Sequence, residues 1–148
     1  MSESSSLDKI RSFYSHDRFA TDACKCSILE ARPDHAVCTF TIEPVHLNAR
    51  GAVMGGAIFT LADFALAVAS NVGGTPSVSV SNTIEYLSTA RGTRLIATCD
   101  AEKSGRNLGF YTVNVQDELG TSVARMCATC YRIQSAQHTA THDKERHG

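Results

Sequence analysis

Asp63 is the residue whose chemical type differs most from its surroundings. It lies within residues 55–69, a run that is otherwise almost entirely apolar. A carboxylate in such surroundings is costly to bury unless it is paired or used, and burial raises its pKa, which suits a general base or a nucleophile. Alternatively, Asp63 and Thr60 lie on one polar stripe of a helix that faces solvent or another subunit. The residues alone favour neither interpretation over the other.

A pair of glycines, Gly55 and Gly56, opens the same run. The first backbone N–H groups of a helix have no partner within it, and with the helix dipole they favour a developing negative charge such as a thioester oxyanion. Gly55 precedes Asp63 by eight residues, just over two helical turns, so one helix could carry both groups. Paired glycines also occur where chains pack closely or turn tightly, so the pair alone is weak evidence.

Several polar side chains near this run are further candidates. Asn48 precedes the glycines and has the donor and acceptor needed to hold a water molecule or a carbonyl group, although asparagine in a loop more often forms a turn. His46 is interpreted as a polar loop residue. Ser79 and Ser81 alternate with valines on a predicted strand, so we expect them to share one face of a sheet. Ordinary strand polarity is the simpler interpretation for Ser81.

The composition limits the class of protein. The chain has 148 residues, 43% of them hydrophobic and 20% charged, with a net charge of −1. We expect a single domain over residues 1–148, with its core at 17–133 and a polar tail at 135–148. Disordered and collagen-like chains are excluded, and the lack of clustered positive charge argues against nucleic-acid binding. His138 and His142 lie in the tail, where we expect no metal site.

The six cysteines are expected to be free thiols. A chain of this size and apolar content needs no disulfides, and its first residues show no basic segment followed by an apolar one, so we expect a cytoplasmic location. Cys127 and Cys130 have the spacing of a redox or zinc pair. They lie in a predicted strand, however, where residues three apart point to opposite faces. We interpret both as small core residues.

Apolar periodicity predicts the elements that must position these side chains. Helical spacing predicts a short amphipathic helix at residues 6–15, and an Ala- and Leu-rich composition predicts a helix at 55–69. Period-two alternation predicts strands elsewhere. The expected strands are residues 24–29, 36–42, 77–87, 94–103, 108–116 and 122–133. Short breaks containing glycine separate the last four strands, which favours an antiparallel meander.

The predicted helix at 55–69 is apolar almost all round, so it must be buried on most sides. A membrane span is excluded because the run is short, begins with two glycines and contains Asp63. The strands are the only large element available to cover this helix. We therefore predict an α+β fold in which an antiparallel sheet wraps around one central buried helix.

Residues 46–63, which read HLNARGAVMGGAIFTLAD, resemble the signature of hotdog-fold acyl-CoA thioesterases of the phenylacetate-pathway (PaaI-like) type. That signature has an Asn-containing loop, then a glycine, then His-Gly-Gly, then a helix with Leu-x-Asp. The likeness continues through residues 79–90, which end in Tyr-Leu-Ser-Thr-Ala, and through the turn at Gly105 and Arg106. It covers roughly residues 17–133, and the combined motif is specific although no single piece of it is.

The resemblance implies a role for each candidate. Asp63 would act as general base or nucleophile on a thioester, and the Gly55 N–H would polarise the thioester carbonyl from a partner subunit. Asn48 would position the water or the carbonyl, and Ser79 would support the site. The resemblance also implies a homodimer or a dimer of dimers with active sites at the interface. The substrate would be a small or aromatic acyl-CoA thioester, a small molecule that is hydrolysed to a free acid and coenzyme A, with no separate cofactor and no metal.

Substrate contacts are expected at Met54, Gly56 and Arg106. Met54 is a departure, because the family usually has histidine there, and methionine neither titrates nor donates a hydrogen bond. The backbone donor at Gly55 does not depend on that side chain. Arg106 is chosen by charge type, as a group that could meet the phosphates of coenzyme A.

Three functions are therefore considered. The first is an acyl-CoA thioesterase, and the second, motivated by Met54, is a non-catalytic acyl-CoA binding or sensing module on the same fold. The third is a hotdog hydratase or dehydratase, which we rank last because no histidine falls in the predicted apolar helix. Aromatic, short-chain and medium-chain acyl groups all stay open, since the depth of the pocket depends on how Phe59, Phe64 and Leu87 pack.

Overall fold

The computed structural model describes residues 2–134. Its helical elements are α1 (Glu3–Tyr14), the π-helix η1 (Phe19–Ala23), the 3-10 helix η2 (Pro44–His46) and α2 (Gly55–Asn71). Its strands are β1 (Ser27–Arg32), β2 (His35–Thr41), β3 (Ser77–Tyr86), β4 (Arg94–Ser104), β5 (Leu108–Asp117) and β6 (Ser122–Arg132). The predicted tail at 135–148, which includes His138 and His142, lies outside the described residues.

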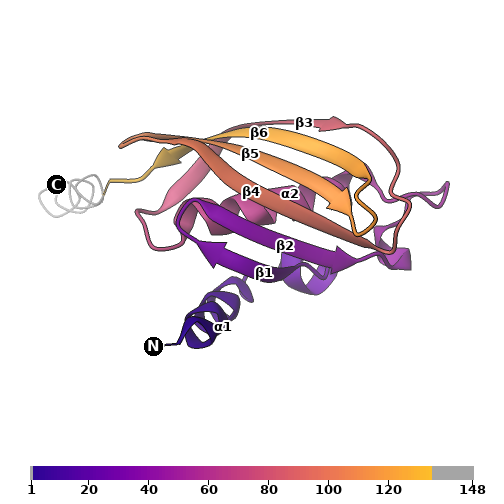
Figure 1. Cartoon of the computed structure of the whole chain (residues 1–148), viewed down its shortest axis with the longest axis horizontal. Coiled ribbons are helices and arrows are strands. Elements are labelled where there is room, and N and C mark those ends of the chain that lie inside the picture. Colours follow the sequence, from indigo (N-terminus) through magenta and orange to yellow (C-terminus); the bar gives the residue numbers. More distant parts are fainter. Residues whose placement is uncertain (1, 135–148) are drawn as a thin grey trace, which may run out of the picture.

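The strands form one six-stranded antiparallel sheet in the order β1-β2-β4-β5-β6-β3. The sheet curves around α2, which confirms the predicted fold (Figure 1). The predicted meander is correct for β4, β5 and β6 but wrong for β3, which pairs with β6 at the opposite edge from β1. The connection at 87–93 is too long for a tight hairpin, so it passes from this edge to the interior strand β4.

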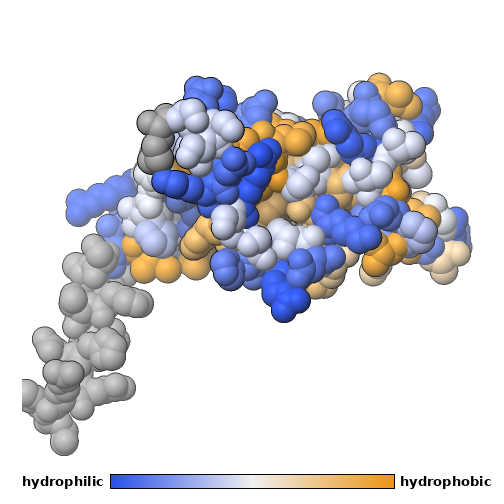
Figure 2. All heavy atoms as spheres, turned by 90° about the horizontal axis from the view of Figure 1, so that it is seen from below, coloured by the Kyte–Doolittle hydropathy of each residue, from blue (hydrophilic) through white to orange (hydrophobic). Residues whose placement is uncertain are grey.

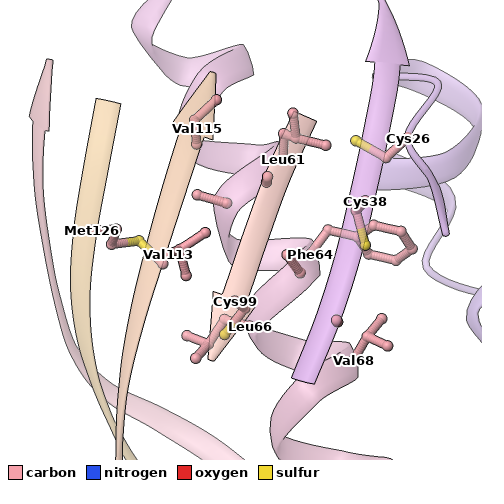
Figure 3. Close-up of a cluster of buried hydrophobic side chains, with 14 of the residues drawn as sticks. Cys26, Cys38, Leu61, Phe64, Leu66, Val68, Cys99, Val113, Val115 and Met126 are labelled. Atoms are coloured by element: carbon pink, nitrogen blue, oxygen red, sulfur yellow. The ribbon is translucent and has the colours of Figure 1, made fainter. Parts of the chain in front are cut away.

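Helix α2 supplies the centre of the hydrophobic core, because its apolar side chains are buried on most sides. It begins at the predicted residue and ends two residues later than predicted, at Asn71. The buried side chains that meet there include Leu61, Phe64 and Val68 from α2 and Cys38, Val113 and Met126 from the sheet (Figure 3). Within the described residues, no helix is long and apolar enough to cross a membrane.

Strand β3 runs antiparallel to α2 and is tied to it at both ends and near its middle. The Ser77 N–H donates to the side-chain oxygen of Asn71 at 2.8 Å. The Asn82 amide nitrogen donates to Asp63 at 3.3 Å, and the Tyr86 hydroxyl donates to the Gly55 carbonyl at 3.0 Å. An edge strand thus aligns its polar side chains with the start and the middle of the buried helix.

Helix α1 and η1 cover part of α2 that the sheet leaves open. The Tyr14 hydroxyl donates to the Ala67 carbonyl of α2 at 3.2 Å, and its ring packs edge-on against Phe64. Arg11 donates to the Ile28 carbonyl of β1 through two nitrogens. Sequence periodicity predicted the helix from residue 6, whereas it starts at Glu3, because the Ser2 hydroxyl caps its first turn. The π-helix η1 was not predicted.

The two cysteines with pair spacing lie on opposite faces of β6, as expected from strand geometry. Cys130 is buried, but Cys127 is exposed on the outer face, so its interpretation as a core residue is wrong. The sheet itself separates the two thiols, which rules out a redox or zinc pair within this strand.

Candidate active site

Asp63 is half-buried on α2 and lines a hollow of about 420 Å³ between α2 and η1. Phe19 of η1 and Phe59 and Phe64 of α2 form its aromatic walls. Asp17, just before η1, lies in the same lining. The carboxylate therefore faces a mainly apolar space, as its position in an apolar run suggested.

Two influences on the pKa of Asp63 oppose each other. Burial raises the pKa, and the negative charge of Asp17 adds to the rise. The hydrogen bond from Asn82 stabilises the ionised form and lowers the pKa, but the net shift is upward. Asp63 is thus a carboxylate with increased proton affinity, held in one orientation by a neighbouring amide.

A bulge in β3 determines which polar side chains of this strand face α2. Ser79 pairs with Cys130 and Ser81 pairs with the adjacent Thr129, which leaves Val80 unpaired between them. Because one extra residue reverses the alternation, Ser79 faces α2 and Ser81 faces outward. The expectation that the two serines share a face is wrong. Ser79 is exposed near the first residue of β3. Asn82 is the β3 residue that contacts Asp63.

Gly55 begins α2 against the ring of Tyr86. The first helical hydrogen bonds run from the N–H groups of Ala57 and Ile58 to the Met54 carbonyl, so the N–H groups of both glycines precede the helical ladder. A Cβ on Gly55 would lie 3.2 Å from the Tyr86 ring. A glycine at this position lets the Tyr86 hydroxyl reach the Gly55 carbonyl while the N–H group stays available.

Asn48 shapes the loop before α2 through its side-chain oxygen. This oxygen accepts from the N–H groups of Arg50 at 2.9 Å and Ala52 at 3.1 Å. Both partners are donors, so the oxygen must occupy this position and the amide NH₂ group points elsewhere. Asn48 therefore has the turn role considered from the sequence, and it also keeps two N–H donors for another acceptor.

Asn48 and Gly55 line a second hollow, of about 410 Å³, whose far wall is the connection at 87–90. Leu87 lines this hollow rather than the one at Asp63. The connection is fixed by the buried carboxylate of Asp117, which accepts from the N–H groups of Arg91 and Gly92. Burial alone would raise the pKa of Asp117, but these backbone hydrogen bonds hold it well below its usual range.

His46 is not the polar loop residue that the sequence suggested. It is only 2% exposed and stacks on Phe40 with ring centroids 3.9 Å apart. Its Nδ1 accepts from the Glu43 N–H, so Nε2 carries the proton and donates to the Cys24 carbonyl at 2.7 Å. Every polar atom of the ring is used to hold the loop, so His46 has a structural role here.

The three predicted substrate contacts lie in different places. Met54 is 56% exposed at the N-cap of α2, and its methyl group lies 3.7 Å from the Cβ position of Gly56. Arg106 is exposed in the turn between β4 and β5, at the end of the sheet where β3 begins. Tyr86 and Gly55 lie at the other end of β3, roughly 30 Å along the strand.

Within one chain the predicted catalytic groups are divided between the two hollows. Asn48 and Gly55 line one, and Asp63 lines the other. The eight residues from Gly55 to Asp63 correspond to about 12 Å along the helix axis. Among the described residues, no group of three or more His, Cys, Asp or Glu could hold a metal ion.

Two residues that the sequence analysis did not single out contact the candidate groups, namely Asn82 and Tyr86. Both belong to the row of β3 that faces α2, with Ile84 between them. The i, i+2, i+4 pattern of Asn82, Ile84 and Tyr86 was visible in the sequence. Their contacts with Asp63 and Gly55 were not, because they depend on the antiparallel alignment of β3 with α2.

The family model of the thioesterase superfamily matches residues 50–124. The acyl-coenzyme A thioesterase PaaI of Escherichia coli is 30% identical over 80% of this chain and 88% of its own length. The solved structure of the E. coli PaaI protein superposes with a TM-score of 0.73, covering 86% of this chain and 96% of that one at 28% identity.

A second solved structure, smu.793 from Streptococcus mutans bound to acetyl-CoA, has a TM-score of 0.69 at 25% identity. It covers 73% of this chain and 88% of that one. The motif, the sheet wrapped around α2 and these likenesses agree. The chain belongs to the hotdog-fold thioesterase superfamily, and within it to the acyl-coenzyme A thioesterases, enzymes that hydrolyse thioesters.

Proposed function

We propose that this protein hydrolyses acyl-CoA thioesters to a free acid and coenzyme A, with Asp63 as the general base or nucleophile. The observation that carries the proposal is the state of Asp63, a half-buried carboxylate in an aromatic hollow. Its pKa is raised by burial, and Asn82 holds its orientation. A group with increased proton affinity and fixed geometry is suited to take a proton from water.

As a general base, Asp63 takes a proton from a water molecule while the water oxygen attacks the thioester carbonyl carbon. The tetrahedral intermediate then collapses, the C–S bond breaks, and coenzyme A leaves as a thiolate. The thiolate takes the proton back from Asp63, so the carboxylate is regenerated. As a nucleophile, Asp63 instead forms a mixed anhydride with the acyl group, and water hydrolyses that anhydride in a second step.

The oxyanion of the intermediate needs donors, and two are available in the hollow at the start of α2. The N–H of Gly55 lies outside the helical ladder, at the positive end of the helix dipole. The NH₂ group of Asn48 is free of the loop bonds that engage its oxygen. Met54 is not required for either donor, which is consistent with activity despite the missing histidine.

Within one chain Asp63 and these donors line separate hollows, so a site that combines them would be completed by a second copy of the chain. We propose a homodimer, or a dimer of dimers, in which Gly55 and Asn48 of one subunit face Asp63 of the other. Strand β3 supports this arrangement, because it is an open sheet edge without a buried residue. Val80 at its bulge is 60% exposed, and apolar open edges favour pairing with another chain. Ser79 then lies close to that interface.

The relatives support the coenzyme A part of the proposed substrate. The S. mutans relative binds acetyl-CoA, and we propose that this chain binds acyl-CoA at the corresponding surface. Met54 and Gly56 flank Gly55 at the start of α2, and we propose that they contact the substrate there. We propose that Arg106 contacts the phosphates of coenzyme A. Because Arg106 lies far from Gly55 within one chain, the same coenzyme A would reach both residues only across subunits.

The test is thiol release from acetyl-, octanoyl- and phenylacetyl-CoA by wild type and Asp63→Asn. The substitution keeps the size and polarity of the side chain but removes the base. We expect turnover by the wild type and a loss of about a hundredfold or more in kcat for the variant, as for removal of a general base. Asp8→Asn, at an exposed carboxylate on α1, is the matched control and should retain full activity.

Full activity of Asp63→Asn would contradict the proposed role. If no acyl-CoA is turned over, calorimetry with the same compounds decides the alternative. Saturable binding without turnover would support the non-catalytic binding module, for which the specific observation is an exposed methionine at the N-cap of α2.

A further inference from the structure

Helix α2 begins at residues that by themselves disfavour a helix start. Its N-cap is Met54, which makes no side-chain capping hydrogen bond, and its first two residues are Gly55 and Gly56. Glycine loses more conformational freedom in a helix than any other residue, and stable helix starts usually have Ser, Thr, Asp or Asn at the N-cap. Helix α1 has such a cap in Ser2. The first turn of α2 must therefore be held by another part of the chain.

The core packing of α2 does not extend to its first turn. Met54 is 56% exposed and Gly56 is also exposed, and the first buried residue of the helix is Ile58. The end of the molecule where α2 begins lies on the right in Figure 2, which shows hydrophobic side chains among hydrophilic ones at this surface. Water can reach the turn there and compete for its backbone groups, which favours fraying.

Tyr86, the last residue of β3, makes the contact that the helix start lacks. Its hydroxyl donates to the Gly55 carbonyl at 3.0 Å. Its ring lies against the same residue, 3.2 Å from the position that a Cβ of Gly55 would take. Tyr86 is itself fixed by the pairing of β3 with β6, in which it lies opposite Ala124. The contact thus ties the first residue of the helix to the sheet.

This contact also fixes the direction of the Gly55 N–H group. The carbonyl and the N–H group belong to one glycine, whose backbone could otherwise rotate freely in a frayed turn. A donor stabilises an oxyanion best when it is aimed at the developing charge before the reaction begins, because no reorganisation is then needed. Holding the Gly55 carbonyl therefore bears on the strength of the proposed oxyanion donor.

We propose that Tyr86 is a positioning residue of the reaction, whose hydroxyl holds the first turn of α2 so that the Gly55 N–H points at the thioester oxyanion. The inference rests on the thioesterase function proposed above. Tyr86 acts through Gly55 and not on the substrate itself. Loss of the hydroxyl should therefore lower kcat, which depends on the oxyanion, and leave KM nearly unchanged.

The first test compares the hydrolysis of acetyl-, octanoyl- and phenylacetyl-CoA by wild type and Tyr86→Phe, which keeps the ring and removes only the hydroxyl. We expect kcat to fall about tenfold, less than for loss of the donor itself, with KM changed by less than about twofold. Tyr14→Phe is the matched control and should retain full activity. The Tyr14 hydroxyl also donates to a carbonyl of α2, that of Ala67, which lies twelve residues beyond Gly55.

A second test adds an independent cap to the helix. Met54 has the extended backbone of an N-cap residue, so the hydroxyl of Met54→Ser can accept from an N–H of the first turn. In the Met54→Ser background, Tyr86→Phe should lower kcat by less than about threefold, because the added cap replaces the missing contact. Both proteins in this comparison carry Met54→Ser, so the effect of that substitution by itself cancels.

Amide hydrogen exchange gives a readout that does not need activity. The N–H groups of Ala57 and Ile58 donate to the Met54 carbonyl, so their exchange reports opening of the first turn. We expect their exchange to be faster in Tyr86→Phe than in wild type and unchanged in Tyr14→Phe. Met54→Ser combined with Tyr86→Phe should bring it back towards the wild-type rate.

Full activity of Tyr86→Phe, beside a wild type that hydrolyses acyl-CoA, would overturn the positioning role and leave the proposed function intact. An equal loss of kcat with and without Met54→Ser would overturn it too, because the hydroxyl would then not act through the helix start. If the wild type hydrolyses no acyl-CoA, the proposed function fails, and hydrogen exchange decides the inference. Faster exchange of Ala57 and Ile58 in Tyr86→Phe supports the hold on the helix start, and unchanged exchange overturns it.

Discussion

The two side chains most important to the proposed reaction are each held by neighbours that also set their chemistry. Asp63 gains proton affinity from burial and loses some of it to the Asn82 amide. The side-chain oxygen of Asn48 accepts two hydrogen bonds within the loop, and its NH₂ group takes no part in these bonds. At the residue scale, therefore, structural and chemical roles can be separated by substitutions that change one atom type at a time.

The pH dependence of hydrolysis should report the environment of Asp63. The ionised carboxylate is the active form, so kcat/KM should fall as the pH drops through a pKa above the ordinary value near 3.8. Asn82→Ala removes the contact that lowers this pKa and should move the fall to higher pH. Asp17→Asn removes a charge that raises it and should move the fall to lower pH. Identical profiles for the three proteins would contradict the assignment.

Asn48→Asp should separate the loop role of Asn48 from its proposed donor role. Aspartate retains an oxygen for the Arg50 and Ala52 N–H groups but replaces the NH₂ donor by a second oxygen. We expect kcat to fall about a hundredfold, as for loss of an oxyanion donor, with little change in Tm. Asn48→Ala is the comparison, because it should lower both kcat and Tm. A highly active Asn48→Asp variant would leave Asn48 with its loop role only.

At the scale of secondary-structure elements, the side chain of His35 links three neighbouring strands of the sheet. His35 starts β2, and its ring bonds Asp100 of β4 at 2.6 Å and Glu30 of β1 at 2.9 Å. Burial alone lowers the pKa of His35, but the two carboxylates raise it by more, so the net shift is upward. The protonated ring can donate to both partners at once.

The free energy of unfolding should consequently fall with rising pH. A raised histidine pKa gives stability that is fully present below the ordinary value of about 6.5 and is lost above the folded-state value. The loss should be less than about 1 kcal/mol, because both carboxylates face solvent. Urea denaturation at successive pH values measures it. His35→Gln should remove the slope, whereas His16→Gln, at an exposed histidine of the α1–η1 connection, should leave it unchanged.

At the scale of the whole molecule, the separation of Asp63 from Asn48 and Gly55 is the main feature. One chain carries the two groups of proposed site residues in separate hollows, and the open edge strand β3 contacts both groups. The proposed dimer would join the two groups into two equivalent sites. The proposed dimer makes a prediction that would not hold if each site were contained within one chain.

Mixed dimers of Asp63→Asn and Asn48→Asp should regain activity that neither variant has alone. Each mixed dimer has one site with both substitutions and one with neither. Refolding equal amounts together makes half of the dimers mixed, so we expect about a quarter of wild-type activity. Each variant refolded with itself is the control, and its sedimentation gives the oligomeric state. A mixture no more active than its components would mean that each site belongs to one chain.

The local patterns of the sequence were sufficient for much of the fold. Helix α2 begins at the predicted glycine, and β3 to β6 lie within one residue of their predicted bounds. Alternation and helical composition are encoded by near neighbours, so they can be read without tertiary contacts. The same holds for Asp63 and Gly55, whose types are unusual for their immediate surroundings.

Tertiary structure alone decided the position of β3, the bulge at Val80 and the burial of His46. It also decided that Asn82 and Tyr86 contact the candidate groups. Each of these depends on which distant segment lies alongside, and that choice is made by the summed burial of the sheet around α2. The sequence by itself determined which residues could do chemistry and on which elements they lie. Only the folded chain determined their neighbours, because long-range packing leaves no local pattern.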